Sequence, residues 1–401
     1  MKRYPSLHSV DCSSDTIGMT LVRYHGYGIG LSISSNGQWM YKLVLSFLLL
    51  LWSLVALPQS TKGIWLTDVA SQALDTKAGI QEVVKRCKAA GMGHIYVVTW
   101  NRGYTIYPSQ VMEDYFQKKV APRFSEFDVL AYLIEEAHQA GLQVHAWFEF
   151  GFSSSYQEAD GGHILRTKPE WKALTREGEL VSKNGFQWMN AFHPEVQSFL
   201  LALISEVVEQ YDIDGVQGDD RLPANPSTAG YDPYTLALYQ QEHGGQVPPA
   251  DYQDEAWIDW RAGKLNLFAE KVYQTVKKID AETAVTMAPS IFSWSKEEYL
   301  QDWPTWVKNG WVDQIIPQVY RYDLDAYTQA LTSNLDYMPD SLKHLFVPGI
   351  LLKVGDYSPS RRFLKRMIKT NRQLGLEGEV FFFYEGMKDH EVFFSKKYPK
   401  L

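Results

Sequence analysis

The sequence has 401 residues, 45% of them hydrophobic and 14% aromatic, and a formal net charge of -8. This length and apolar content suffice for one large α/β domain with insertions. The acidic balance, with no visible basic stripe, argues against nucleic acid as a partner. The 13 Trp and 24 Tyr residues fit either sugar-stacking platforms or a large core with loop anchors.

The first 62 residues predict a targeting region. Lys42 follows Met40 and precedes an apolar run from Leu43 to Leu57, which has the length of a signal-peptide core and is shorter than the ~20 residues of a spanning helix. We expect residues 1–39 to be a non-native or disordered extension and residues 40–62 to be a signal peptide or signal anchor. The protein would then be exported to the periplasm, cell envelope or medium, and an uncleaved anchor would tether it to the membrane.

The chain has two cysteines, Cys12 and Cys87. Because Cys12 lies in the extension, the domain from 63 to 401 would carry one thiol and no internal disulfide. We expect Cys87 to be buried and inert, since it falls in an apolar-periodic helix without a neighbouring Cys or His. We expect a monomer that needs no cofactor.

From residue 63 onward, short apolar runs alternate with helical patterns. The expected strands are 63–67, 94–100, 143–150, 214–220, 284–290, 314–320, 344–350 and 379–385. The expected helices lie within 75–91, 127–141, 194–211, 254–280, 299–309, 323–337 and 360–374, the first with Asp75 as its N-cap and the third with Pro194 in its first turn.

Each expected strand is almost continuously apolar, as parallel strands buried on both faces are. Eight strand–helix units predict a single (β/α)₈ TIM barrel. A doubly wound sheet is the alternative, and it is disfavoured because no Gly-rich phosphate turn follows the first strand. The long loops follow strands two, three and four, which lie on one face of a barrel and would build a cleft wall there.

The fourth expected strand ends in "DGVQGDDR", with two aspartates and an arginine. Side chains alternate along a strand, so Gln217 and Asp219 share one face. We expect Asp219 to point into the barrel mouth and Asp220 and Arg221 to position substrate. The competing interpretation, that both aspartates are turn residues, is weakened because the next expected helix starts far downstream.

The third expected strand, "QVHAWFEF", places His145, Trp147 and Glu149 on one face. Glu149 and Asp219 would end neighbouring strands, and glycosidic cleavage uses such a pair of carboxyls. Desolvation beside aromatic rings would raise the pKa of Glu149, which suits a catalytic acid. Glu385, which closes the eighth strand, is the alternative acid.

Other polar and aromatic residues at strand ends are candidate substrate contacts, with core or loop packing as the competing interpretation for each. They are Asp68, Trp100, Asn101, Trp147, His193, Gln318 and Tyr320. Trp100, Trp147 and Tyr320 are the candidate sugar platforms. No His-x-His, His-Glu-x-x-His or Cys cluster is present, so no metal site is expected.

Four motifs taken in order resemble the family 10 glycosyl-hydrolase-like proteins of the bacterial envelope: "GIWLTDV", "HAWFEFG", "DIDGVQGDDR" and "PQVYR". The resemblance covers residues 63 to about 390. It implies a (β/α)₈ barrel and a hydrolase acting on an envelope glycan, with peptidoglycan glycan strands as the substrate of some members. The sequence departs from the family at Gln217, where the usual pattern has His.

The sequence therefore predicts an exported glycoside hydrolase that cleaves an envelope or extracellular polysaccharide. Asp219 and Glu149 are its expected catalytic pair. The alternatives are a non-catalytic glycan-binding protein on the same fold and a metal-dependent polysaccharide deacetylase, which chelators would inhibit.

Overall fold

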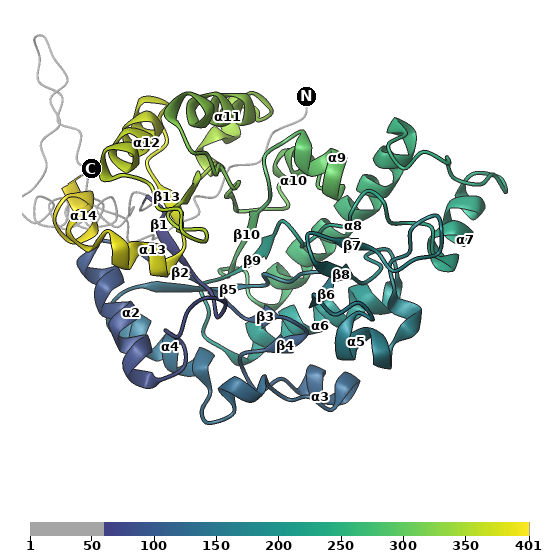
Figure 1. Cartoon of the computed structure of the whole chain (residues 1–401), viewed down its shortest axis with the longest axis horizontal. Helices are drawn as coiled ribbons and strands as arrows, with labels where there is room; N and C mark the ends of the chain where they lie inside the picture. Colours follow the sequence, from purple (N-terminus) through teal and green to yellow (C-terminus); the bar gives the residue numbers. More distant parts are fainter. Residues whose placement is uncertain (1–59, 401) are drawn as a thin grey trace, which may run out of the picture. The chain divides into compact units, whose positions relative to one another are not determined.

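The computed structural model describes residues 60–400 (Figure 1). The predicted extension at 1–39, and nearly all of the predicted targeting segment at 40–62, lie outside the described residues. Within residues 60–400, no helix combines the length and the apolar character that a membrane crossing requires.

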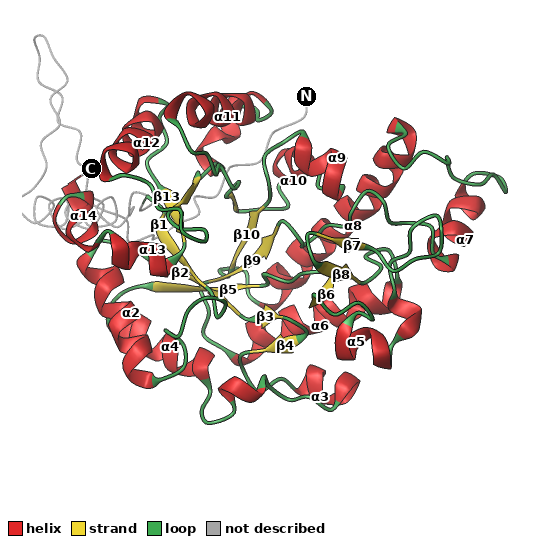
Figure 2. Ribbon diagram, in the orientation of Figure 1, coloured by secondary structure: helices red, strands yellow, loops and turns green. Residues whose placement is uncertain are grey.

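Within residues 60–400, eight parallel strands form one sheet, in the order β11-β10-β9-β5-β2-β1-β13-β12. Their bounds are β1 (Lys62–Leu66), β2 (His94–Val98), β5 (Gln143–Trp147), β9 (Gly215–Asp219), β10 (Ala284–Ala288), β11 (Gln314–Ile315), β12 (Gly349–Leu351) and β13 (Glu379–Phe382). The strands are mostly buried, as the apolar runs predicted. The sheet curls and helices surround it (Figure 2).

The helices on the outside of the sheet follow the predicted alternation. They are α2 (Lys77–Ala89), α4 (Val129–Gln139), α6 (Pro194–Gln210), α8 (Glu255–Ile279), α9 (Trp294–Tyr299), α10 (Trp303–Asn309), α11 (Leu324–Asp336), α12 (Arg361–Gln373), α13 (Tyr384–Asp389) and α14 (Glu391–Lys396), with 3₁₀ turns η3 (Asp340–Leu345) and η4 (Tyr398–Lys400). Pro194 opens α6 as predicted. The N-cap of α2 is Thr76 instead of Asp75, because Asp75 accepts a hydrogen bond from Arg123.

Every strand except β1 is shorter than predicted, and the two that differ most are β11 and β12. β11 ends at Ile315, two residues before Pro317, which has no N–H to continue a ladder. The strand expected at 344–350 begins at Gly349, because η3 extends to Leu345 and Pro348 has no N–H to donate to a ladder. Two isolated parallel bridges, Ile315 to Phe346 and Gln318 to Gly349, join these two segments at the ends of the sheet.

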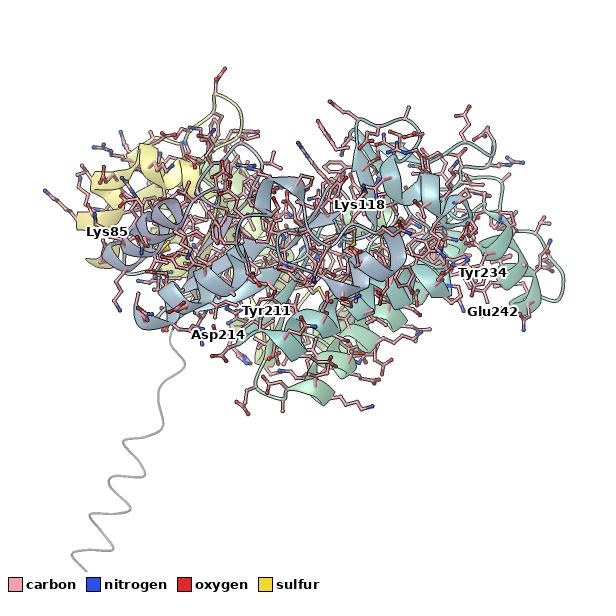
Figure 3. The ribbon with its side chains drawn as sticks, turned by 90° about the horizontal axis from the view of Figure 1, so that it is seen from below. Lys85, Lys118, Tyr211, Asp214, Tyr234 and Glu242 are labelled. Atoms are coloured by element: carbon pink, nitrogen blue, oxygen red, sulfur yellow. The ribbon has the colours of Figure 1, made fainter. Side chains whose placement is uncertain are left out.

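The long loops after the second, third and fourth strands are confirmed, and they carry small elements that the sequence did not reveal. After β2 come β3 (Trp100–Asn101), β4 (Tyr104–Thr105), α3 (Gln110–Phe116) and η1 (Pro122–Phe124). After β5 come β6 (Ser153–Tyr156), α5 (Gly162–Thr167), η2 (Pro169–Trp171), β7 (Ser182–Lys183) and β8 (Phe186–Trp188), whose strands form an antiparallel sheet in the order β6-β8-β7. After β9 comes α7 (Pro233–Glu242). Tyr234 and Glu242 on α7 lie at one end of the described part, opposite Lys85 on α2 (Figure 3).

The sheet buries polar side chains on its inner face, below the strand ends. His145 packs against His94, with Nε2 and Nδ1 3.0 Å apart, and stacks on Tyr96 with ring centroids 4.5 Å apart. Burial lowers the pKa of both imidazoles, so they stay neutral at physiological pH. Cys87 is fully buried on the outer side, as predicted, and burial raises its pKa to about 12.

Arg261 on α8 anchors the loop that follows β9. Its fully buried guanidinium donates to the backbone carbonyls of Ser227, Ala229 and Tyr252, the last two at 2.6 Å. It also lies 4.4 Å from the ring centroid of Trp257. One side chain thus satisfies acceptors from two stretches of an otherwise irregular loop.

We expect Arg261→Met to lower the free energy of unfolding by about 3 kcal/mol, because these carbonyls would lose their donor. Chemical denaturation measures the change. The matched control is Lys271→Met, exposed on the same helix, which should change stability by less than about 0.5 kcal/mol. Equal effects of the two substitutions would contradict the anchoring role.

Candidate active site

A cavity of about 160 Å³ lies at the carboxyl ends of the parallel strands, where α/β barrels place their active sites. Charged and polar side chains line one side and aromatic rings the other. The lining residues are Trp65, Trp147, Glu149, Phe186, Asp219, Asp220, Arg221, Ala288, Gln318, Tyr320 and Phe382. The sequence predicted that Trp147, Glu149, Asp219, Asp220, Arg221, Gln318 and Tyr320 belong to the site, and the structure brings these seven together.

Arg221 contacts three carboxylates in this cavity. Its Nη1 lies 2.9 Å from Asp220 Oδ1, and its Nη2 lies 3.5 Å from Asp219 Oδ2 and 3.7 Å from Glu149 Oε1. Its Nε donates to the backbone carbonyl of Glu149 at 2.8 Å, and its guanidinium lies 4.6 Å from the ring centroid of Phe186. One positive charge therefore faces up to three negative charges in a largely buried space.

Asp219 is held from several directions. Its Oδ2 accepts a hydrogen bond from Trp147 Nε1 at 2.8 Å, and its Oδ1 accepts from Gln318 Nε2 at 2.9 Å and from the backbone N–H of Asp220. Its backbone carbonyl accepts from Gln301 Nε2 at 2.8 Å. Burial, with the neighbouring Asp220 charge, raises the pKa of Asp219 well above its usual range. The orientation of this carboxyl group is thus fixed by strand-end side chains.

Glu149 follows β5 and faces the same cavity. Its Oε2 accepts a hydrogen bond from Asn101 Nδ2 at 2.9 Å and a longer one from Thr67 Oγ1 at 3.3 Å. Asn101 Nδ2 also donates to Asp68 Oδ1 at 2.8 Å. The first three strand ends therefore supply one connected hydrogen-bond chain that orients Glu149.

The pKa of Glu149 is raised to about 7. Burial is the largest cause, and the negative charges of Asp68 and Asp220 add to it, while Arg221 opposes it. A glutamic acid with this pKa is protonated in a large fraction of molecules at neutral pH. It can therefore donate a proton to a leaving oxygen, which is what a catalytic acid must do.

The predicted alternation along the fourth strand is also consistent with the contacts. Gln217 lies fully buried on the inner face, where its Oε1 accepts from Trp65 Nε1 at 2.6 Å and its Nε2 donates to Thr286 Oγ1 at 3.1 Å. Gln217 and Asp219 thus share one face, and Gln217 forms the floor below the carboxylates.

Five predicted residues are not among those that line this cavity: Asp68, Trp100, Asn101, His193 and Glu385. Trp100 is fully buried, donates to the carbonyl of Gly151 at 3.0 Å and packs edge-on against Phe199, so it offers no face to a sugar. His193 is the N-cap of α6 and accepts from the backbone N–H of Glu195. Both contacts are explained by packing and capping.

Glu385, the alternative acid, was predicted to close the eighth strand, but β13 ends at Phe382 and Glu385 lies in the first turn of α13. It lines a neighbouring cavity together with Asp68. Its Oε1 accepts from Ser71 Oγ at 2.7 Å, and its Oε2 lies 2.9 Å from Lys388 Nζ. It is therefore paired with a cation outside the cavity that holds Glu149 and Asp219.

Several lining residues were missed by the sequence analysis. Trp65 lies inside an apolar strand and Phe382 inside another, so neither differs from a core residue in pattern. Phe186 comes from β8, in a sheet that the sequence did not predict. Within residues 60–400, no group of three or more His, Cys, Asp or Glu side chains is arranged to hold a metal ion.

A protonatable, desolvated glutamate beside a second carboxyl group, at the carboxyl edge of a curled parallel sheet, is the arrangement that glycoside hydrolases use. The sequence comparison agrees, because residues 60–353 match the family Glycosyl hydrolase-like 10. The protein belongs to this family and is a glycoside hydrolase. The resemblance seen in the four motifs is thereby confirmed.

Two curated relatives and one solved structure illustrate the similarity. The chain is 25% identical to glycosyl hydrolase YngK of Bacillus subtilis over 79% of this chain and 66% of that protein, and 23% identical to glycosyl hydrolase DigH of Escherichia coli over 75% of each. The PgaB (BpsB) glycoside hydrolase domain from Bordetella bronchiseptica aligns with a TM-score of 0.62 at 14% identity, over 84% of this chain and 98% of that one. The structural likeness supports the fold.

We expect Arg221→Gln to lower the free energy of unfolding by about 3 to 5 kcal/mol at pH 8, because buried carboxylates would lose their cation. The loss should be smaller at pH 5. Without Arg221 the folded-state pKa values of Glu149 and Asp219 rise further, so protonation relieves the repulsion below them. Denaturant unfolding at the two pH values measures this.

The matched control is Arg166→Gln, which also removes a cation next to two carboxylates, Glu158 and Asp160, but from a side chain that is 53% exposed. We expect Arg166→Gln to change the free energy of unfolding far less than Arg221→Gln does, and by the same amount at both pH values, because water screens an exposed ion pair. A loss from Arg221→Gln that does not depend on pH would contradict the charge argument.

Proposed function

We propose that the protein hydrolyses glycosidic bonds of an envelope or extracellular polysaccharide, with peptidoglycan glycan strands as the leading substrate, by carboxylate acid–base chemistry. The observation that carries the chemistry is the convergence of Glu149 and Asp219 on one guanidinium, that of Arg221, in a cavity with aromatic walls. The family membership and the resemblance of the four motifs support the substrate class.

Glu149 is the proposed acid. In its protonated form it donates to the glycosidic oxygen as the bond to the anomeric carbon breaks, and the leaving sugar departs as an alcohol. Asp219 is the proposed second carboxyl group, acting as base or nucleophile in its ionised form, which the charge of Arg221 and the donors Trp147 and Gln318 favour against the effect of burial. Its hydrogen bonds to Trp147 and Gln318 keep its orientation fixed during the reaction.

The charges of the cavity favour the transition state. Positive charge develops on the sugar ring as the bond breaks. Asp220 and Asp219 supply a negative field that Arg221 offsets in part, and such a prearranged field stabilises developing charge most strongly where water is excluded. Burial raises the pKa of Tyr320 well above its usual range, so its phenol stays protonated and can donate to a sugar oxygen.

We further propose that the sheet closes as a (β/α)₈ barrel. The isolated bridges between the β11 and β12 segments support closure, since they connect the two ends of the sheet. Closure would bring Gln318 and Tyr320 opposite Glu149 across the mouth. This geometry agrees with their common place in the cavity lining.

We expect kcat/KM to fall as the pH rises through about 7, because the acid Glu149 loses its proton there. Glu149→Gln should lower kcat/KM at least ~100-fold and remove this limb of the profile, and Asp219→Asn should cause a comparable loss. The assay follows new reducing ends from peptide-free glycan strands. Asp340→Asn, whose side chain is 94% exposed, is the control and should keep full activity.

The outcomes of this assay separate the proposed hydrolase from the glycan-binding and deacetylase alternatives, and Asp219 from Asp220 as the second carboxyl group. Hydrolysis that survives Asp219→Asn would move the second carboxyl role away from Asp219, with Asp220 as the next candidate. Binding of glycan without hydrolysis, across peptidoglycan, peptide-free strands and chitosan, would favour the glycan-binding class. Inhibition by a chelator together with acetate release would favour the deacetylase.

Export is part of the proposal and rests on the apolar run from Leu43 to Leu57. We expect residues 40–62, fused to alkaline phosphatase that lacks its own signal, to give active enzyme outside the bacterial cytoplasm, where its disulfides can form. A fusion with Leu49→Arg and Leu50→Arg should be inactive, because charges interrupt the apolar core. Equal activity of both fusions would contradict export through this segment.

A further inference from the structure

A second, larger cavity of about 690 Å³ lies next to the active-site cavity. Its walls come from the loops after β1 and β2 and from α13, and its volume is in the range of small-molecule binding sites. Its lining is mainly polar, with Asp68, Asp75 and Glu385 as acids and Arg102, Arg123 and Lys388 as bases. None of these side chains takes part in the proposed proton transfer.

The two cavities share a hydrogen-bond chain. Asp68 lines the larger cavity and accepts from Asn101 Nδ2 at 2.8 Å, and the same Nδ2 donates to Glu149 Oε2 at 2.9 Å. A group bound beside Asp68 is therefore one side chain away from the proposed acid. A sugar unit next to the bond that is cleaved would occupy such a position, because it is separated from the proposed acid by the Asn101 side chain alone.

Two of the three cations in the larger cavity already have carboxylate partners. Arg123 lies 2.6 Å from Asp75, and Lys388 lies 2.9 Å from Glu385. Arg102, by contrast, forms no salt bridge within residues 60–400, and its guanidinium lies 5.9 Å from the ring centroid of Tyr156. The exposed Arg102 is thus available to an anionic group of a ligand.

The backbone at Arg102 also points to a role for its side chain. Arg102 and Gly103 form the two-residue turn between β3 and β4, with φ values of 50° and 76°. Such a turn strongly prefers Asn, Asp or Gly at its first position, because other side chains clash at positive φ. An arginine at this position disfavours the turn, and a contact of its side chain with a ligand would offset this cost.

The remaining acid, Asp68, is less available than Arg102. It is only partly exposed, it accepts from Asn101, and Arg123 Nη1 donates to its backbone carbonyl at 2.7 Å. Burial raises the pKa of Asp68, while its hydrogen bond from Asn101 and the charges of Arg123 and Arg102 oppose the shift. Of the charged side chains that line this cavity, Arg102 is therefore the one whose charged group forms no hydrogen bond or salt bridge within residues 60–400.

We infer that the larger cavity is a sugar-binding subsite for a unit that carries a carboxylate, and that Arg102 is its specificity-determining residue. This inference rests on the proposed function, since it assigns the subsite next to the proposed acid. Arg102 would bind the carboxylate through charge-assisted hydrogen bonds. The enzyme would then select acidic over neutral glycans through the unit beside the cleaved bond.

The test compares peptide-free peptidoglycan glycan strands with the same strands after their carboxylates have been amidated with carbodiimide and ammonia. We expect the wild-type chain to cleave the unmodified strands with about tenfold higher kcat/KM, mainly through KM. Arg102→Asn should lose this preference while keeping the turn, because Asn tolerates positive φ. Arg176→Asn, at an exposed arginine outside both cavities, should keep it.

Calorimetric binding of both strand preparations to the inactive Glu149→Gln variant, with and without Arg102→Asn, separates this inference from the proposed function. Binding that depends on Arg102 and on the carboxylates, in the absence of any hydrolysis by the wild type, would retain the subsite and overturn the hydrolase proposal. Equal cleavage of both preparations, or faster cleavage of the amidated one, would overturn the subsite and retain the hydrolase. Neither cleavage nor charge-dependent binding would overturn both.

Discussion

The active-site cavity depends on one ion-pair network, in which Arg221 holds Glu149, Asp219 and Asp220 close together. Three buried carboxylates that contact one guanidinium would repel one another strongly if that guanidinium were absent. The positive charge of Arg221 is therefore what allows them to lie together. The backbone makes room for it: the carbonyl of Arg221 accepts from Phe152 N–H at 2.9 Å, and a Cβ at Gly151 would lie 2.0 Å from that carbonyl. The loops after β5 and β9 therefore meet backbone to backbone, which explains why glycine follows "HAWFEF".

The two central carboxyl groups could be predicted from the sequence because strand geometry is regular. Parallel pairing of β5 with β9 sets Trp147 opposite Gln217, and the alternation of side chains then directs Glu149 and Asp219 to the same edge. The apolar runs also gave the eight strands and the helices between them. The strands, the helices and these two carboxyl groups follow from local periodicity, which can be recognised in one sequence alone.

The remaining parts depend on contacts that periodicity does not encode. Thr67 and Phe186 enter the site from a strand end and from an insertion, and nothing in their neighbourhood distinguishes them from packing residues. Trp100 is the opposite case, a residue that was predicted to bind sugar but is buried in the core. The sequence around a tryptophan at a strand end does not reveal whether its indole stacks on a ligand or donates a hydrogen bond to a backbone carbonyl. A buried network such as the one around Asp219 is specified by tertiary structure.

The antiparallel sheet β6-β8-β7 forms part of the cavity wall but supplies none of the side chains that orient Asp219. Asp219 is oriented by Trp147 and Gln318, which belong to the strand ends. The insertion that contains this sheet contributes Phe186 to the cavity. Two contacts hold the insertion against α9, an ion pair between Lys183 and Glu298 and a hydrogen bond from Asn184 to Tyr299. This insertion can therefore change in length or sequence without removing the contacts that orient Asp219. The segment from 153 to 188 is therefore the part of the cavity wall that can vary while the strand ends stay constant, provided that an aromatic ring remains over Arg221.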